Sequence, residues 1–175
     1  MILQLLIRQQ GSLSYVREYG IDITVVRFFN VIGPNQTGKY GMVVPRFIRQ
    51  ALHNEPITVY GDGSQVRAFM DVRDCINMLQ ILAEHESSKG EIVNVGTPHE
   101  ITIGKLANMI KENSNSSSEI TYVPYDEAYG IDFEEIYHRK PDLTKLFGLT
   151  GYSAKWSLEE TINYLIEQQL ETKKD

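Results

Sequence analysis

The chain has 175 residues, of which 42% are hydrophobic and 23% charged, and its formal net charge is −6 at pH 7. This composition is typical of a globular protein with enough apolar material for one core, and the acidic balance argues against a general affinity for nucleic acid or an anionic membrane surface. The single cysteine, Cys75, gives no reason to expect an oxidising compartment, so we expect a cytoplasmic protein with neither nucleic acid nor membrane as a partner.

The first third of the sequence predicts a helix, a strand and a second helix. Apolar residues recur at roughly helical spacing over 1–19 and end at Gly20, a residue type that favours a helix C-terminus. The next segment, 21–29, is β-branched and aromatic, and its apolar run is typical of a strand covered on both faces in a parallel sheet. Glycine and proline then mark a long loop that leads to a second helix over about 42–53.

Short strands alternate with helices through the rest of the chain, which favours an α/β fold whose long loops form a binding site. Either Asp71 or Asp74 is able to cap the helix that follows them, and the sequence does not choose between the two. The Asn- and Ser-rich segment 113–118 predicts a mobile surface loop. The remaining expected elements are strands over 56–60, 91–95 and 120–123, an extended piece over 68–72, and helices over 75–84, 103–111 (capped by Thr102), around Leu146 (capped by Asp142) and from Ser157 to about 170.

Four sequence segments, taken in order, resemble those of a known family. Residues 27–34 (RFFNVIGP) match the pattern R-[FY]-[FY]-N-x-x-G-P, and segments 59–74, 92–96 (IVNVG) and 137–145 (YHRKPDLTK) continue the series. Each segment alone is a weak signal, because the Gly-Asp-Gly in the second is merely a turn, but together they cover most of the chain. The sequence resembles the carboxy-terminal part of the NAD-dependent epimerase/dehydratase family, the extended short-chain dehydrogenases that act on nucleotide sugars.

This resemblance implies a fold and a division of the chain. The fold would be α/β, made of the C-terminal part of a Rossmann-like NAD(P)-binding fold together with the small nucleotide-sugar-binding domain. Residues 1–35 would form the last part of the Rossmann-like domain, and residues 36–171 mostly the substrate-binding domain, with returning Rossmann elements at about 68–96. All of these segments would belong to a single unit, 1–175.

A site for a sugar linked to a diphosphate needs rigid bidentate donors and helix amides. Arg67 follows a tight turn, and the resemblance implies that it contacts the diphosphate. Asn30 follows the predicted buried strand, where the carboxyl end of a parallel strand faces a ligand crevice. The resemblance also suggests phosphate-binding amides near Val43 and Val44, and Tyr60 against the nucleobase.

Two further residues complete the predicted site. Arg139 lies in a segment very similar to that of UDP-glucuronic acid decarboxylases, in which the matching arginine reaches the sugar ring. Phe29, together with Asn30, would lie against the cofactor, which the family implies to be NAD. Structural alternatives stay open, since Asn30 could stabilise a turn, Arg67 could be a surface arginine and Tyr60 could be a packing residue. The four histidines show no metal-ligand spacing, so we expect no metal site.

The catalytic machinery of the family does not match this sequence. Its Gly-rich turn, whose glycines let the backbone approach the cofactor pyrophosphate, has no counterpart among the 175 residues. The tyrosine and lysine of the family's Tyr-x-x-x-Lys pair fall near Met1 and Leu5, neither of which titrates. The nearest lookalike runs from Tyr15 to Tyr19 and lies one helix length too late, so we predict no catalytic residue.

Two functional hypotheses follow. The first is a truncated nucleotide-sugar enzyme of the UDP- or dTDP-sugar 4-epimerase, 4,6-dehydratase or decarboxylase type, which retains part of the substrate site and does not turn over by itself. The alternative is a non-catalytic subunit or interaction remnant that needs a separate N-terminal half. In both cases the strand at 23–29 should expose an apolar edge, because most strands of the parallel sheet would be missing, and we expect self-association there.

Overall fold

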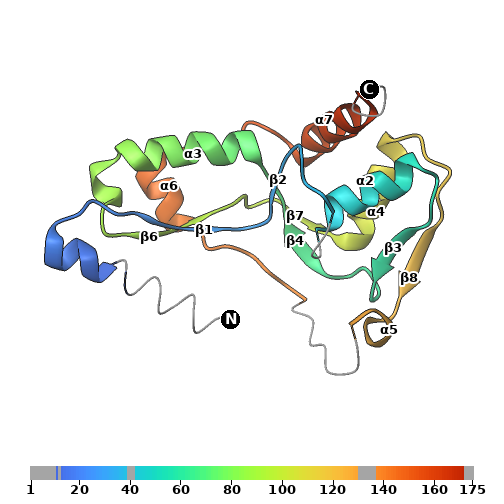
Figure 1. Cartoon of the computed structure of the whole chain (residues 1–175), viewed down its shortest axis with the longest axis horizontal. Coiled ribbons are helices and arrows are strands. Elements are labelled where there is room, and N and C mark those ends of the chain that lie inside the picture. The colour runs from blue at the N-terminus through green and yellow to red at the C-terminus, as the bar shows by residue number, and fades with distance from the viewer. Residues whose placement is uncertain (1–10, 12, 39–41, 130–136, 172–175) are drawn as a thin grey trace.

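The computed structural model describes residues 11, 13–38, 42–129 and 137–171. Its helices and strands fall into two parts that lie end to end, joined by short strands near the middle (Figure 1). The first, which we call the β1 part, contains β1 (Val25–Phe28), α3 (Val72–Glu84), β6 (Ile92–Val95) and α6 (Thr144–Thr150). The second, the α2 part, contains α2 (Val43–Leu52), β3 (Ile57–Tyr60), α4 (Ile103–Asn113), β8 (Ile120–Val123), α5 (Tyr125–Tyr129) and α7 (Leu158–Glu171). The joining strands are β2 (Val31–Ile32), β4 (Val66–Ala68), β5 (Met70–Asp71) and β7 (Glu100–Thr102), and a short 3-10 helix covers Glu86–Ser88.

The β1 part is built on a parallel strand pair. β1 lies beside β6 in a register that runs from Val25 opposite Ile92 to Phe28 opposite Val95. Helices α3 and α6 pack on this pair, and their apolar residues share one buried cluster with β6. The side chains of β1 itself are only half-buried, and Phe28 is 56% exposed. The expectation of a strand covered on both faces is therefore not met by the described residues, which leave the β1 side chains half-buried or exposed.

The α2 part has the larger core. Helix α2 presents an apolar face, with Phe47 and Ile48 at 0% exposure, to helices α4 and α7 and to strand β3. β3 pairs in parallel with β8, and the buried β3 side chains Ile57 and Val59 belong to this core. The observed bounds of α2, β3, α4, β8 and α7 lie within a few residues of the predicted ranges, because their apolar spacing and end signals are strong.

Two predicted helix ends are confirmed by their hydrogen bonds. Thr102 accepts from the amide of Lys105 at the start of α4. Ser157 and Glu160 form the expected capping box, in which the Ser157 amide donates to the Glu160 carboxylate and the Glu160 amide donates to the Ser157 hydroxyl. Asp142 accepts from the Thr144 amide, but it lies one residue before Leu143, the N-cap of α6.

The start of α3 decides between the two aspartates. Asp71 is the N-cap, accepting from the Arg73 amide at 2.7 Å, so the helix begins at Val72 and not at residue 75. Asp74 lies inside the first turn at 0% exposure and accepts from the Tyr152 hydroxyl and from the amide of Trp156. Asp74 therefore ties the loop before α7 to α3, which is a tertiary role that a capping rule does not anticipate.

The Ser-rich segment after α4 is held in place. The Ser116 hydroxyl donates to the carbonyl of Ala51 at 2.7 Å, and Ser118 is 2% exposed. The Ser117 amide donates to the Asn54 side chain just past the end of α2. These bonds satisfy groups at the C-terminal end of α2, so the expectation of a mobile loop is not supported by the geometry. The polar side chains of this segment anchor it to the end of α2.

The N-terminal helix is partly described. Residues 13–19 are helical, as expected, and end at Gly20, whose φ is +63°. The predicted positions of the family's tyrosine and lysine, Met1 and Leu5, lie outside the described residues. A search of the described helices found none that combines the length and apolar character needed to cross a membrane.

Candidate functional site

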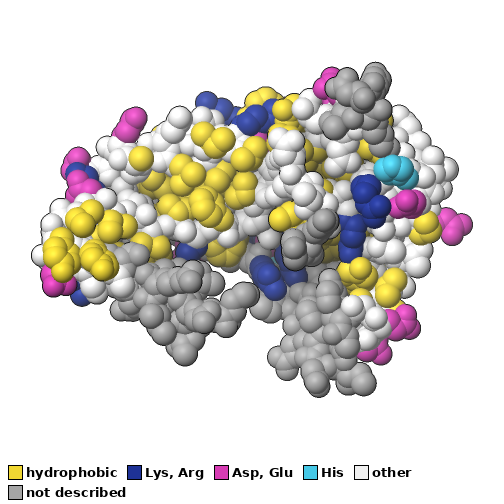
Figure 2. Space-filling view, in the orientation of Figure 1, with side chains coloured by type: hydrophobic (Ala, Val, Ile, Leu, Met, Phe, Trp, Pro, Cys, Tyr) yellow, Lys and Arg dark blue, Asp and Glu magenta, His cyan; other side chains and the backbone are white. Residues whose placement is uncertain are grey.

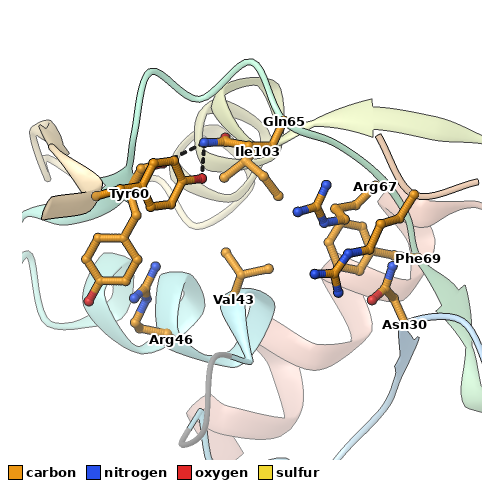
Figure 3. Close-up of a pocket in the computed structure, with 10 residues that line it drawn as sticks. Asn30, Val43, Arg46, Tyr60, Gln65, Arg67, Phe69 and Ile103 are labelled. Carbon is orange, nitrogen blue, oxygen red and sulfur yellow. Dashed lines mark hydrogen bonds between the residues drawn. The ribbon is translucent and has the colours of Figure 1, made fainter. Parts of the chain in front are cut away.

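A cavity of about 220 Å³ lies between the α2 part and the joining strands. Figure 3 shows Arg46 and Tyr60 on one side of it, with Arg67, Phe69 and Asn30 on the opposite side. We call it the arginine cavity, because three arginines line it and no carboxylate is among its described lining residues. The lining residues are Asn30, Val43, Arg46, Tyr60, Gln65, Arg67, Phe69, Ile103, Tyr125 and Arg139.

Arg67 is presented by β4, a strand flanked on one side by β7. Side chains alternate along a strand, so Arg67 projects on the face opposite that of its neighbours Val66 and Ala68. Its guanidinium donates to the carbonyl of Val66 at 2.8 Å and to that of Tyr137 at 3.3 Å. These bonds orient the side chain in the cavity, and the backbone of Arg67 is paired with Ile101 of β7.

Asn30 has both a structural and a site-facing position. It follows β1 with φ at +40°, a left-handed conformation that asparagine tolerates better than most residues. Its side-chain amide donates to the carbonyl of Ala68 at 3.0 Å, while its own carbonyl accepts from the Met70 amide. Asn30 therefore lines the cavity while its side chain bonds the distant strand β4 and not a turn of its own, and its contact with substrate stays a prediction.

The other predicted residues divide into two groups. Val43, Tyr60 and Arg139 line the arginine cavity with Asn30 and Arg67, so five of the six residues predicted to bind substrate come together there. The Val44 side chain is 1% exposed in the core, and Val44 lines a smaller adjoining hollow of about 160 Å³. Phe29 does not line the arginine cavity, and its amide donates to the Val95 carbonyl at 3.0 Å.

Arg46 is a cavity residue that the sequence interpretation missed. Its guanidinium lies 4.2 Å from the centre of the Tyr60 ring and donates to the Thr58 carbonyl at 3.0 Å. The Nε atom is buried and has no acceptor in the described part of the chain. A buried donor without an acceptor is costly, so this face of the cavity favours an acceptor-rich ligand. The available signal was helical spacing, since Arg46 lies three residues after Val43, on the same helix face.

Gln65 and Tyr125 are two further cavity residues that the sequence interpretation missed. The Gln65 side chain, 1% exposed, donates to the Tyr60 carbonyl at 2.9 Å and also to the Tyr125 hydroxyl. The Gln65 Oε1 atom is buried without a described partner. Gly61 makes room for this pair, because with φ at +71° a Cβ there would lie 2.4 Å from the Tyr125 ring. Nothing in the local sequence of Tyr125 marks it as a site residue.

The charge of the cavity determines the ligands that it suits. Figure 2 shows dark-blue Lys and Arg side chains over α2 and beside β4, in a protein whose net charge is −6. Guanidinium groups are planar and always charged, and they bind phosphate and carboxylate oxygens with paired hydrogen bonds. The arrangement therefore suits an anion attached to a flat, polar ring. No cluster of three or more metal-ligating side chains occurs among the described residues.

Comparison with known proteins gives a consistent result. Residues 6–96 match the model of the NAD dependent epimerase/dehydratase family. A UDP-N-acetyl-alpha-D-glucosaminuronate decarboxylase from Bacillus cytotoxicus is 42% identical over 153 residues, which are 85% of this chain and 47% of the relative. The chain thus spans about half the length of this curated relative.

Solved structures share the fold. The UDP-glucose 4-epimerase of Thermotoga maritima, solved with UDP-glucose, is 30% identical with a TM-score of 0.83, over 94% of this chain and 50% of that one. The UDP-glucuronic acid 4-epimerase of Bacillus cereus, solved with UDP-glucuronic acid and NAD, is 26% identical with a TM-score of 0.79, over 91% of this chain and 48% of that one. The predicted fold class, α/β and Rossmann-like in part, is confirmed.

The residues present do not by themselves fit NAD. A dinucleotide site needs a Gly-rich turn at a helix N-terminus, and the sequence contains no Gly-x-x-Gly-x-x-Gly. Of the two residues predicted to contact the cofactor, Asn30 uses its side-chain amide on the Ala68 carbonyl. The side chains described here can bind and orient an anionic ligand, but they do not assemble the dinucleotide site.

Proposed function

Because the chain belongs to the NAD-dependent epimerase/dehydratase family, we propose that its arginine cavity binds the nucleoside diphosphate part of a nucleotide sugar. The observation that carries this proposal is the convergence of Arg46, Arg67 and Arg139 on one cavity that also contains Tyr60 and Tyr125. Charge-assisted hydrogen bonds from guanidinium groups are among the stronger contacts available to phosphate oxygens. Aromatic rings beside them offer a flat surface to a nucleobase.

The placement of these residues suggests an orientation for the ligand. Tyr60 and Arg46 lie on the side opposite Arg67 and Asn30 (Figure 3). An elongated ligand would place its base toward Tyr60 and Gln65, and its phosphates toward Arg67. Arg139 would then lie near the sugar end, where its positive charge favours a sugar that carries a carboxylate.

For the whole reaction we propose an epimerase, dehydratase or decarboxylase acting on a UDP- or dTDP-sugar. NAD in this family supplies hydride transfer at a sugar carbon, which this chain does not perform with its own residues. The part played by this chain is to bind the nucleotide and to fix the sugar at the edge of the cavity. A dinucleotide-binding region, which the 175 residues do not contain, would have to complete the active site.

Calorimetric titration with UDP-glucuronic acid tests the binding proposal. Arg67→Ala should weaken binding at least about tenfold, because a hydrogen bond to a charged group contributes about 1.5–3 kcal/mol. Arg49→Ala is the matched control, because it removes the same charge from α2 outside the cavity. Arg49 lies in an exposed ion pair with Glu55 at 3.5 Å. No heat with the wild-type protein at millimolar ligand, or equal losses in both variants, would reject the proposal.

A second candidate function is association through the β1 edge. The observation that favours it is the parallel β1–β6 pair, in which Phe28 on β1 is 56% exposed. Parallel sheets are normally covered on both faces, so such a pair favours a further strand or layer. Figure 2 shows hydrophobic side chains gathered over α3 and β1. The partner that would fit is a second copy or a polypeptide with the remaining parallel strands and the Gly-rich turn.

Co-expression distinguishes this candidate from a simple binding protein. A polypeptide carrying the missing half of a related enzyme should co-purify with the chain and confer NAD binding on the complex. Arg67→Ala would leave that association unchanged, whereas it would weaken the binding of the sugar nucleotide. Failure to co-purify, together with a monomeric wild-type chain, would exclude the β1 edge as an interface.

A further inference from the structure

The segment 137–140 lies alongside β4 and is joined to it by a single β-bridge. The Val66 amide donates to the Tyr137 carbonyl at 2.8 Å, and the Arg139 amide donates to the Val66 carbonyl at 3.4 Å. These bonds form a parallel bridge between Val66 and His138. On its other edge β4 pairs with β7, where Ala68 lies opposite Glu100. β4 is therefore flanked by the segment that carries Arg139 and by the strand that carries Glu100.

Strand alternation separates the side chains of this segment onto two faces. Arg139 lines the cavity, as Arg67 does on the adjacent strand. His138 and Lys140, on either side of Arg139, contact Glu100: the His138 Nε2 atom lies 2.7 Å from one carboxylate oxygen and the Lys140 Nζ atom 3.2 Å from the other. Such alternation is what an extended backbone imposes. One carboxylate thus holds both neighbours of a cavity arginine.

Ala68 leaves room for the contacts between Glu100 and the 137–140 segment. It lies on β4, between β7 and that segment, is 1% exposed, and occupies the position opposite Glu100. Its methyl group is small enough for the longer side chains of β7 and of the segment to meet. The Glu100 side chain is 26% exposed, whereas those of His138 and Lys140 are 57% and 52% exposed, so these contacts lie at the protein surface. Their effect is therefore expected on the position of the segment more than on overall stability.

We propose that Glu100 is a positioning residue: by pairing with His138 and Lys140 it keeps the 137–140 segment in register with β4, and so keeps Arg139 in the arginine cavity. This role rests on the proposed function, since it is measured through binding of the anionic ligand. Glu100 itself does not line the cavity. Its effect on the ligand passes through the backbone of the segment.

The direction in which ligand affinity changes when Glu100 is replaced distinguishes the positioning role from long-range electrostatics. Glu100 is a negative charge near a cavity for an anion, and its removal should tighten binding if only long-range charge mattered. The positioning role predicts the opposite result, because release of the segment withdraws Arg139. Glu100→Gln removes the charge with little change in volume. Glu112→Gln, at an exposed position on α4, removes the same charge elsewhere and serves as the control.

Titration with UDP-glucuronic acid, with thermal unfolding measured in parallel, tests the inference. Glu100→Gln should weaken binding about three- to tenfold, in the range of couplings between residues in one network. In an Arg139→Ala background the same change should have no further effect. A charge swap, Glu100→Lys with Lys140→Glu, should recover affinity and provides a test should Glu100→Gln fold poorly.

The outcomes are distinguishable. Binding by Glu100→Gln that equals or exceeds that of the wild type, or an equal loss with Glu112→Gln, would overturn the positioning role while leaving the proposed function intact. A loss that persists undiminished in the Arg139→Ala background would overturn it as well. Absence of binding by the wild-type chain would instead reject the proposed function, and the positioning role with it.

Discussion

Strand β3 of the α2 part and strand β1 of the β1 part differ in how completely their side chains are covered. In the α2 part, β3 packs against α2 and α4 with Ile57 and Val59 at 0% exposure. In the β1 part, the first strand has only half-buried side chains, and Phe28 is 56% exposed. The comparison indicates that the α2 part supplies its own core and one side of the arginine cavity, whereas β1 has the character of a strand that further structure would cover.

The largest effect is expected in the core of the α2 part. Phe47→Ala should lower the free energy of unfolding by about 3–5 kcal/mol, because Phe47 is 0% exposed and its removal leaves a cavity. Phe147→Ala, on α6 of the β1 part, is the matched control, since Phe147 is 38% exposed. Urea unfolding of both variants measures the difference. A similar loss in the two would contradict the unequal covering of the parts.

A smaller effect is expected where the parts join. Burial raises the pKa of the Asp71 carboxyl, but hydrogen bonds from Arg73 outweigh it and leave the pKa below its ordinary value. Asp71 therefore stabilises the fold above its unfolded pKa of about 3.9, and this contribution is lost as the pH falls through the lower folded-state pKa. Asp71→Asn should cost about 1–3 kcal/mol at pH 7, since it keeps an N-cap oxygen but removes the charge that pairs with the Arg73 guanidinium.

Urea unfolding as a function of pH checks this expectation. The difference between wild type and Asp71→Asn should be constant near neutral pH and should shrink in the acid range. Glu159→Gln, in the exposed first turn of α7, provides a carboxylate control. A difference that grows on acidification would have the wrong sign for a carboxyl whose folded-state pKa is lowered.

The smallest effect on stability is expected at the β1 edge. Phe28→Asp should change the free energy of unfolding by no more than about 0.5–1 kcal/mol, because Phe28 is 56% exposed. It should nevertheless reduce self-association in sedimentation velocity, since a charge on a sheet edge opposes pairing. Tyr122→Asp, at 51% exposure on β8, is the control from the α2 part. A monomeric wild-type chain at all concentrations would contradict this prediction.

The sequence predicts those site residues that lie within recognisable motifs. Asn30, Tyr60, Arg67 and Arg139 come from segments up to about a hundred residues apart, yet all four line one cavity. The order of the motifs carries this information because each segment resembles a segment of the family whose position in the family's fold is known. No geometry could be read from the spacing alone.

Residues outside those motifs could not be found in the same way. Arg46 belongs to the cavity because α2 turns that face toward Tyr60, and Tyr125 belongs to it because Gln65 holds its hydroxyl. Both depend on contacts between elements, which local sequence does not encode. The choice of Asp71 over Asp74 as a cap has the same origin, since Asp74 is bound by Tyr152 from a distant segment.

Hydrogen exchange with and without UDP-glucuronic acid tests most directly whether the arginine cavity is the ligand site. We expect slower exchange in the ligand-bound protein at the start of α2, in segment 60–67 and in segment 137–139, with β1 and β6 unchanged. Slower exchange confined to β1 and β6, or no change in the three cavity segments at saturating ligand, would contradict the account.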